Sequence, residues 1–351
     1  MKPKTTIPVK TPTGEYPIHI YDGVLTDAGA KLRELGFAGK CAIVTNPTVG
    51  QYYAEQLTES LTDAGFSPVL CEIPDGEQYK TLATVAGLYD RFLAAGLERG
   101  NPVLSLGGGV TGDIAGFAAA SYLRGVPFVQ IPTSLLAMVD ASVGGKTGVD
   151  LPQGKNLVGA FKQPEMVLID PLVLETLPGA EFRSGLAEVV KHGIIADETL
   201  LEKLRAGDFS LGWMIAAAVR VKVSVVEEDP FESGRRAVLN LGHTFGHAFE
   251  KLSDFRLRHG EGVAMGIVCA ARLAQSLGHC TPETTARITD TLAFLDLPTE
   301  PPAHPFESVW AAMGADKKKA AGKLRFVLPR AIGDVDIFAD VPRSVVQSIL
   351  E

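Results

Sequence analysis

The chain has 351 residues, and at roughly 150 residues per domain this length favours two domains. Hydrophobic residues make up 46% of it and charged residues 21%, which is enough apolar material for a sizeable core and excludes a disordered chain. The 41 acidic and 33 basic residues leave a formal net charge of −8. This balance disfavours a broad nucleic-acid-binding surface, although it leaves room for a local basic pocket.

The sequence pattern is that of a reduced intracellular protein. Residues 1–21 carry early lysines but no apolar core of a signal peptide. The longest uncharged stretch near the centre, residues 125–139, contains prolines and is too short to cross a bilayer. The four cysteines form no Cys-x-x-Cys pair. We therefore expect a soluble cytoplasmic protein with neither a membrane nor a nucleic acid as partner.

The first half of the chain alternates strand and helix signals, which predicts a parallel sheet. Helical patterns at 48–64 and 82–95 lie between some of the strands. The short β-rich runs are at 41–45, 68–73, 102–106, 126–131 and 166–169.

The second half reads mainly as helices. Two short strand-like runs, 324–328 and 335–338, follow them near the end. Leu177-Pro178-Gly179 is the plausible joint, so we predict a Rossmann-like domain over 1–178 and a mostly helical domain over 179–351. The predicted helices are 183–194, 196–206, 212–227, 236–252, 260–278, 282–295 and 306–314.

A glycine loop follows the predicted strand 102–106. Gly107, Gly109 and Gly112 fit G-x-G-x-x-G between a strand and a helix, where bare glycines let the backbone approach a pyrophosphate at a helix N-terminus. The usual acid about 20 residues on is missing, because residues 131–134 read Ile-Pro-Thr-Ser. The loop therefore predicts a variant nucleotide site rather than a standard one; the alternative is a tight packing turn.

A second glycine loop, 144–147, reads Gly-Gly-Lys-Thr and resembles the end of a P-loop. The first glycine of that motif would fall at position 140, which is Asp140, so a Walker A motif is rejected. The loop can still present Lys146 to an anion beside Asp140, or it is an exposed basic turn.

Histidines cluster in the second half. His243 and His247 are spaced i,i+4 and share a helix face, and His259 begins another predicted helix. Glu188 lies on a third helix. Three or four N and O ligands from separate helices suit a catalytic divalent metal with an open position. Spacing alone leaves open which three residues bind it.

Several basic positions punctuate apolar or glycine-rich segments, and asparagines lie near them. Each alone is an ordinary solvated side chain, but together they suggest a substrate with more than one negative charge. They are Lys146, Lys155, Lys191, Lys222, Arg236 and Lys317–Lys319, with Asn156 and Asn240.

Taken in order, these motifs make the chain resemble the 3-dehydroquinate synthases of the sugar-phosphate cyclase superfamily. The match runs from about residue 40 to 337 and several of its motifs are long and chemically unusual. They are residues 75–80 (Asp-Gly-Glu-Gln-Tyr-Lys), 107–113, 132–140, 144–148, 155–156, 185–194, 240–247 and 259–266.

The resemblance implies an NAD-binding Rossmann-like domain, a helical domain holding a divalent metal, usually zinc or cobalt, an active site between them, and a homodimer. It implies Glu188, His243 and His259 as metal ligands, with His247 left to bind substrate and handle protons. Arg124 matches a residue that reaches across the dimer. The other implied substrate contacts are Asp140, Lys146, Asn156, Lys191, Lys222, Arg236, Asn240 and either Lys317 or Lys318, with Lys318 preferred.

The implied cofactor contacts lie in the first half. Residues 46–48 match the family less clearly, so no adenosine contact is carried over to them. The contacts that do carry over are Asp75, Gly76, Glu77, Lys80, Gly108, Gly109, Val110, Gly112, Asp113, Thr133, Ser134, Lys146, Lys155 and Thr176.

The implied reaction converts 3-deoxy-D-arabino-heptulosonate 7-phosphate into 3-dehydroquinate and phosphate. NAD oxidises one carbon transiently, phosphate leaves by elimination, the hydride returns, and an intramolecular aldol step closes the ring. Three alternatives remain: a related cyclase whose substrate lacks the carboxylate, a metal- and NAD-dependent polyol dehydrogenase, and a non-catalytic binding protein. Arg236, Asn240 and Lys318 favour the 3-dehydroquinate synthase reaction over these alternatives.

Overall fold

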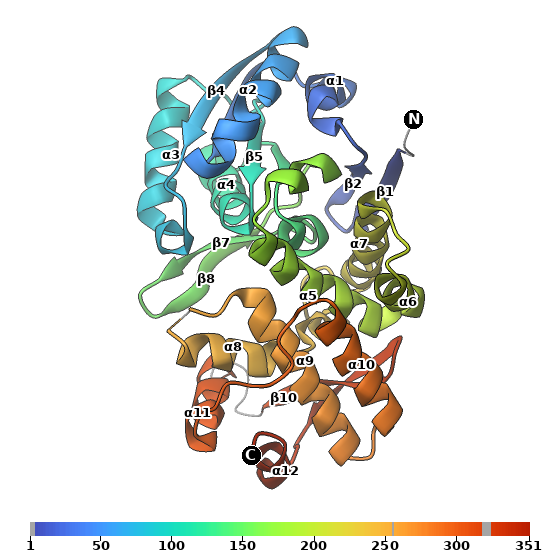
Figure 1. The fold of residues 1–351 in the computed structure, drawn as a ribbon. Helices are drawn as coiled ribbons and strands as arrows, with labels where there is room; N and C mark the ends of the chain where they lie inside the picture. The colour runs from blue at the N-terminus through green and yellow to red at the C-terminus, as the bar shows by residue number, and fades with distance from the viewer. Residues whose placement is uncertain (1–3, 255, 318–323) are drawn as a thin grey trace. The chain divides into compact units, whose positions relative to one another are not determined.

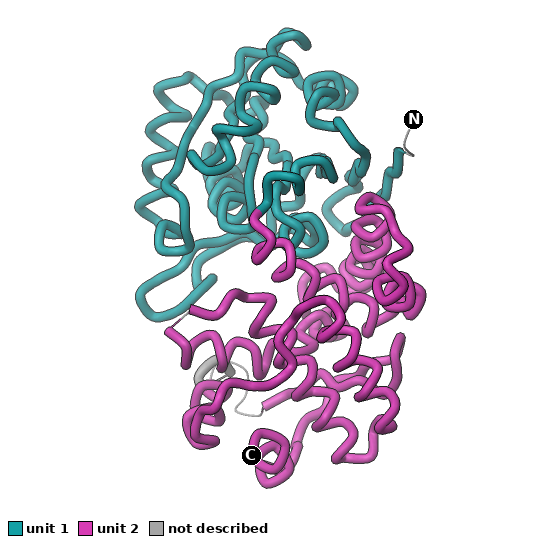
Figure 2. Tube along the Cα trace, viewed as in Figure 1, with its two compact units in different colours: residues 1–177 teal, residues 178–351 magenta. Residues whose placement is uncertain are grey.

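The computed structural model describes residues 4–254, 256–317 and 324–351 (Figure 1). The chain divides into two compact units, residues 1–177 and residues 178–351 (Figure 2). No helix in the described ranges is both long enough and apolar enough to cross a membrane.

Unit 1 contains a seven-stranded sheet in the order β1-β2-β9-β6-β5-β3-β4. Only the β1–β2 hairpin is antiparallel, and the other neighbours pair in parallel. The strands are β1 (Thr5–Thr11), β2 (Gly14–Ile20), β3 (Gly39–Thr45), β4 (Phe66–Glu72), β5 (Val103–Gly107), β6 (Phe128–Pro132) and β9 (Met166–Ile169).

Helices cover both faces of this sheet because its central strands are apolar on both. Alternate residues of β3 point to opposite sides: Cys41 and Ile43 join one core cluster, while Ala42 and Val44 join the other. The first cluster is completed by α1 (Ala28–Glu34) and α2 (Pro47–Asp63), and the second by α3 (Leu82–Ala94) and α4 (Gly109–Ser121).

A separate hairpin lies between β6 and β9 in the chain. It pairs β7 (Lys146–Leu151) with β8 (Gly154–Phe161). The two backbones approach so closely that a Cβ atom on Gly159 would lie 2.2 Å from the carbonyl oxygen of Thr147. Glycine is therefore required where the strands cross.

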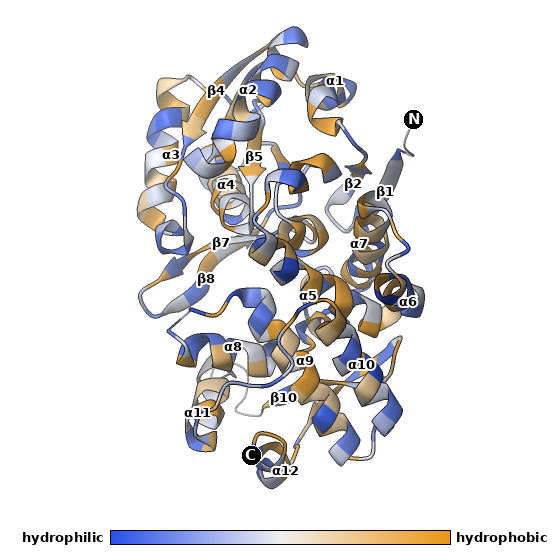
Figure 3. Ribbon diagram, in the orientation of Figure 1, coloured by the Kyte–Doolittle hydropathy of each residue, from blue (hydrophilic) through white to orange (hydrophobic). Residues whose placement is uncertain are grey.

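Unit 2 is mostly helical, with one antiparallel hairpin of β10 (Arg325–Ala331) and β11 (Asp334–Ala339). Its α5 is buried continuously over residues 184–195, and Figure 3 shows hydrophilic as well as hydrophobic residues along it. The helices are α5 (Gly179–Ala196), α6 (Glu198–Ala206), α7 (Leu211–Glu228), α8 (His243–Leu252), α9 (His259–Ser276), α10 (Pro282–Phe294), α11 (Phe306–Lys317) and α12 (Arg343–Ser348).

The predicted fold class is confirmed, but some elements differ from the sequence-based expectation. The single helix predicted over 236–252 is wrong: a 3-10 turn (Arg235–Asn240) and α8 are separated at Gly242, whose φ of 82° is left-handed. The hairpins β1–β2 and β7–β8 and the short helices α1 and α12 were not predicted.

Candidate active site

Unit 1 has a strand-order reversal of the kind at which nucleotides bind. From β3 the chain crosses to β4 on one side and then to β5 on the other. In open parallel sheets ligands bind beyond the carboxyl ends of the strands at this point. The predicted cofactor residues follow those ends: Asp75, Gly76, Glu77 and Lys80 after β4, residues 108–113 after β5, Thr133 and Ser134 after β6, and Thr176 after β9.

The glycine loop leads directly from β5 into α4. Gly108 is the N-cap of α4, and a Cβ atom there would meet nothing nearer than the Ser134 hydroxyl at 3.5 Å. On Gly112 a Cβ atom would lie 2.9 Å from Oε1 of the buried Gln130, so this glycine sets the close packing of α4 on β6. Open backbone at a helix N-terminus fits a pyrophosphate.

A buried lysine ties the β7–β8 hairpin to this loop. Lys80 Nζ donates to Asp113 Oδ2 and to Asn156 Oδ1, each at 2.5 Å. Burial disfavours the Lys80 cation, but Asp113 outweighs burial and raises the pKa of Lys80. Asn156 has a left-handed φ of 54° and its N–H donates to Asp150 Oδ1. Three predicted site residues therefore form one network.

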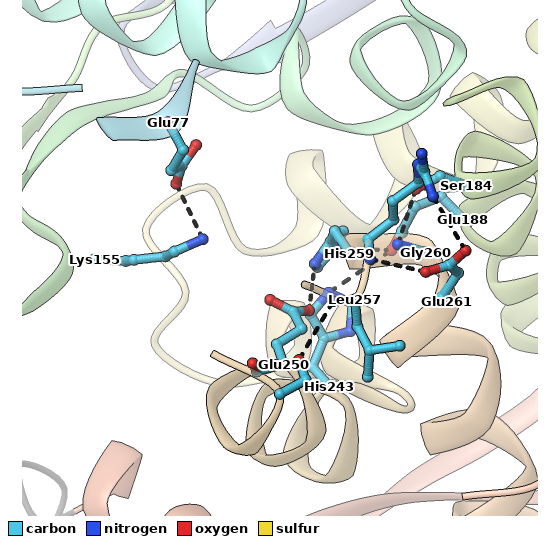
Figure 4. Close-up of polar contacts among 12 residues, drawn as sticks. Glu77, Lys155, Ser184, Glu188, His243, Glu250, Leu257, His259, Gly260 and Glu261 are labelled. Carbon is cyan, nitrogen blue, oxygen red and sulfur yellow. Dashed lines mark hydrogen bonds and ion pairs between the residues drawn. The ribbon is translucent and has the colours of Figure 1, made fainter. Parts of the chain in front are cut away.

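Other predicted residues of unit 1 are also placed along this edge. Lys155 pairs with Glu77 at 3.2 Å (Figure 4). Asp75 accepts from Thr48 Oγ1 at 2.6 Å and from Asn46 Nδ2 at 3.2 Å, which brings in the segment that matched the family less clearly. Thr176 contacts the Tyr53 hydroxyl at 2.5 Å.

The remaining unit 1 predictions vary in exposure. Asp140 is half-buried in a π-helical turn (Ala137–Ala141). Lys146 is exposed at the start of β7. Arg124 is exposed in a turn where Leu123, Arg124 and Gly125 all have positive φ.

In unit 2, glycines bring three helices together around the predicted metal ligands. A Cβ atom on Gly266 of α9 would lie 2.0 Å from the carbonyl oxygen of Gly242, just before α8. One on Gly260 would lie 1.9 Å from the carbonyl oxygen of Ser184 on α5, whose hydroxyl accepts from the Gly260 N–H at 3.0 Å. These crossings place side chains of α5, α8 and α9 side by side.

Glu188, His243 and His259 meet at this junction (Figure 4). Glu188 Oε1 lies 3.7 Å from His243 Nε2 and 3.6 Å from His259 Nε2. Bonds of about 2.1 Å in tetrahedral geometry would separate two zinc ligand atoms by about 3.4 Å. The donor set and its spacing therefore fit a divalent metal.

Each histidine is held through its other ring nitrogen. His243 Nδ1 lies 3.1 Å from the Leu241 carbonyl oxygen, which only accepts, so Nδ1 carries the proton. His259 Nδ1 lies 3.0 Å from Glu250 Oε1. Both Nε2 atoms therefore face Glu188 in the orientation needed of metal ligands.

The charge states of the two histidines differ. Burial, helped by Lys191, lowers the pKa of His243 to about 3, which keeps its imidazole neutral. Burial acts in the same direction on His259, but hydrogen bonds to Glu188 and Glu250 outweigh it and raise its pKa to about 10. A metal arriving here would displace the proton of His259.

Further predicted residues surround this cluster. Lys191 forms a buried ion pair with Glu188, Lys222 is buried on α7, and His247 is exposed one turn beyond His243. Arg236 is 2% exposed, and its guanidinium donates to the Pro230 carbonyl oxygen at 2.5 Å. Asn240 donates to Glu232 at 3.2 Å.

A cavity of about 200 Å³ opens beside the histidines within unit 2. It adds Thr244 and Arg325 to the predicted Asn240, His243 and His247. Arg325 gave no signal in the sequence because it lies in a strand far along the chain. Glu250 did give one, since it follows His243 by seven residues on the same helix face. Lys318 lies outside the described residues, as does the side chain of Lys317.

Comparisons with known proteins identify the fold family. Residues 70–184 match the family model for the 3-dehydroquinate synthase N-terminal region, and residues 185–319 match that for the C-terminal region. A 3-dehydroquinate synthase of Synechococcus is 48% identical, with 98% of each chain covered. One from Geobacter metallireducens is 48% identical over 92% of each chain. The chain belongs to the 3-dehydroquinate synthase family.

Solved structures of other sugar-phosphate cyclases share the fold. The 2-epi-5-epi-valiolone synthase of Streptomyces hygroscopicus, with NAD⁺ and Zn²⁺ bound, is 31% identical and has a TM-score of 0.87, with 95% of each chain covered. A 2-deoxy-scyllo-inosose synthase with carbaglucose-6-phosphate, NAD⁺ and Co²⁺ is 25% identical, with a TM-score of 0.88 and 99% of each chain covered.

These comparisons confirm that the chain is an enzyme of the phosphate-eliminating cyclase class, and the predicted cofactor pair of NAD and a divalent metal is that of its structural neighbours.

Proposed function

We propose that the chain converts 3-deoxy-D-arabino-heptulosonate 7-phosphate into 3-dehydroquinate and phosphate, using NAD that is regenerated within each turnover. The observation that carries this proposal is the meeting of Glu188, His243 and His259, with both Nε2 atoms directed at one carboxylate oxygen, in a chain 48% identical to synthases of this name. When bound, the metal would lower the pKa of a substrate hydroxyl and NAD would accept and return a hydride.

The chain's own residues would bind and orient a dianionic substrate. Buried Arg236 and Lys222 can pair with carboxylate or phosphate oxygens, and Asn240 and His247 border the cavity beside the metal ligands. Lys146, Asn156 and Lys318 complete the proposed substrate-binding set, with Asp140 and Lys191. The protein would thus act mainly by positioning groups and stabilising charge.

The neutral His243 and the exposed His247 would have separate tasks. His243 holds its proton on Nδ1 against the Leu241 carbonyl oxygen, so its Nε2 lone pair is committed to the metal. His247 stands beside it, with ring centroids 5.2 Å apart. We assign proton handling to His247, because it lines the cavity but is not one of the three proposed metal ligands, Glu188, His243 and His259.

The proposed NAD site is supported by the geometry of unit 1. The glycine loop offers open backbone at the N-terminus of α4, at the strand-order reversal. Glu77, Lys80, Asp113 and Lys155 then stand beside the loop as polar contacts. Val110 and Thr133 would contribute backbone and side-chain contacts.

We also propose a cytoplasmic homodimer. Leu123 and Arg124 adopt left-handed backbone conformations, which non-glycine residues keep only where the surrounding structure fixes them. This turn presents an exposed Arg124, as expected of a side chain offered to a second copy. Sedimentation of the wild type and of Arg124→Ala, together with the activity of each, tests this assignment.

The decisive experiment measures phosphate release from the heptulosonate phosphate by metal-loaded protein with NAD below the substrate concentration. Phosphate in large excess over NAD, without a rise in NADH absorbance, is expected from internal redox cycling. Stoichiometric NADH would instead indicate a polyol dehydrogenase. Phosphate released only from a sugar phosphate lacking the carboxylate would indicate a related cyclase with a different substrate.

A further inference from the structure

The polar contacts of His259 extend beyond the proposed ligand set. Its Nε2 faces Glu188, but its Nδ1 lies 3.0 Å from Oε1 of Glu250 (Figure 4). Glu250 is 6% exposed and lies on α8, seven residues after His243. One buried carboxylate therefore stands behind the imidazole while another stands in front of it.

The backbone around Glu250 holds this carboxylate in place. A Cβ atom on Gly262 of α9 would lie 3.2 Å from both Cγ and Oε1 of Glu250. A larger residue at position 262 would press on the Glu250 side chain, so glycine favours its close approach to the first turn of α9, where His259 begins the helix. The contact between Glu250 and His259 is thus a consequence of how the two helices pack.

We propose that Glu250 is a positioning residue that fixes the His259 ring with its proton on Nδ1 and its Nε2 lone pair directed at the metal. Carboxylates behind metal-binding histidines orient the ring and increase its basicity, and their loss typically weakens metal binding by about 10- to 100-fold. His243 needs no such side chain, because a backbone carbonyl does the same for its Nδ1.

An alternative role is available on the same residues. The ligand atoms of His247, Glu250 and His259 also lie within 4.8 Å of one another, so Glu250 could itself bind the metal. The two roles differ in what an amide can replace. Gln keeps the shape and an acceptor oxygen for the Nδ1 proton but removes the negative charge that makes the ring more basic, so a positioning role predicts a partial loss of Zn²⁺ affinity. A ligand role predicts a complete loss, because an amide is a far poorer metal ligand than a carboxylate.

The test measures Zn²⁺ affinity directly, by competition with a chromophoric chelator on metal-stripped protein. Glu250→Gln and Glu250→Asp are compared with Glu188→Gln and with Glu261→Gln. Glu261 is the matched control, because it lies in the same turn of α9 and caps Arg258 N–H at 2.9 Å without touching His259 through any described contact. The absorption spectrum of the Co²⁺-substituted protein reports ligand geometry in parallel.

We expect Glu250→Gln to weaken Zn²⁺ binding by about 10- to 100-fold and to change the Co²⁺ spectrum, while Glu261→Gln changes neither. Unchanged affinity in Glu250→Gln would overturn the proposal. A loss as complete as that of Glu188→Gln would also overturn it, because Glu250 would then be a ligand. An equal loss of Zn²⁺ affinity in Glu261→Gln would also overturn the proposal, because any change of charge at the N-terminus of α9 would then have the same effect.

This inference rests on the proposed metal site, and the two can fail separately. If the wild-type protein takes up no Zn²⁺, the proposed function fails. If it binds Zn²⁺ and Glu250→Gln binds equally well, only the positioning role fails.

Discussion

The nucleotide loop of unit 1 and the metal cluster of unit 2 both depend on glycine, but for opposite reasons. At Gly108 a side chain would meet nothing nearer than 3.5 Å, so the missing Cβ leaves space. At Gly266 a side chain would overlap the Gly242 carbonyl oxygen at 2.0 Å, so the missing Cβ lets two helices touch. The first kind of glycine makes room for a ligand, and the second makes side chains from different helices meet.

Metal and nucleotide are proposed to bind in different units of the chain. Removing one metal-binding side chain should therefore abolish metal binding without abolishing NAD binding. We expect His243→Ala to abolish Zn²⁺ binding and to lower turnover by at least about 10³-fold, because the metal supplies the main activation of the substrate. NAD binding, followed by fluorescence quenching, should be retained. Normal turnover in this variant would remove His243 from the ligand set.

Filling the helix contact should cost both stability and metal affinity. Gly266→Ala places a methyl group against backbone that has no room to retreat, so we expect the free energy of unfolding to fall by about 2 kcal/mol, with weaker Zn²⁺ binding. Urea unfolding of the metal-free protein measures the first effect and chelator competition the second.

Gly314→Ala is the matched control for that variant. Gly314 lies in α11, and a Cβ atom there would meet no described atom within 4 Å. Alanine is a better helix former, so this change should stabilise the protein by about 0.4–1 kcal/mol. A loss of stability at position 314 as large as that at 266 would contradict the contact argument.

The same change in the nucleotide loop should spare stability. Gly108 has φ −73° and ψ −172°, which alanine adopts without strain. We expect Gly108→Ala to leave unfolding within about 0.5 kcal/mol of wild type. Its methyl group would occupy the proposed cofactor space and weaken NAD binding by about 10-fold, or ~1.4 kcal/mol. Unaltered NAD affinity, measured by calorimetry, would move the cofactor away from this glycine.

The nucleotide loop was more readable from the sequence than the metal cluster for a physical reason. Its glycines lie within six residues at the end of one apolar strand, so the local pattern defines the site. The metal ligands come from three helices, and the spacing of His243, His247 and His259 could not say which would face Glu188. Only the crossings at Gly260 and Gly266 decide it, and these are tertiary contacts.

Two elements were predicted wrongly or missed for reasons that lie in the local backbone. The apolar periodicity continues through residues 236–252, but the left-handed Gly242 ends one element and begins another. The β7–β8 hairpin was missed because its glycines weaken the strand signal, although Gly148 and Gly159 are what let the strands approach. Arg325 reaches the cavity beside the histidines from a strand, and no motif connects it to them.

At residues 229–236, a side-chain carboxylate of the protein itself accepts a group of backbone N–H bonds. Asp229 accepts the N–H groups of Ser233, Gly234 and Arg236 at 2.7–3.0 Å. These bonds, led by that of Ser233, outweigh burial and lower the pKa of Asp229 to about 2. A protein carboxylate here does what we propose a cofactor phosphate does at the glycine loop.

The charged Asp229 should therefore add a small, pH-dependent contribution to the free energy of unfolding, and Asp229→Asn should remove it. Because the pKa of Asp229 in the folded state lies below the usual aspartate value of 3.8, this stabilisation is fully present above about pH 4 and is lost as pH falls toward 2. Urea midpoints of wild type and Asp229→Asn should therefore differ most near neutrality and converge in acid. Asp290→Asn, an exposed change on α10, should show no such convergence. A constant difference between wild type and Asp229→Asn across this range would mean that the Asp229 charge does not hold the segment carrying Arg236, and that its shape alone does.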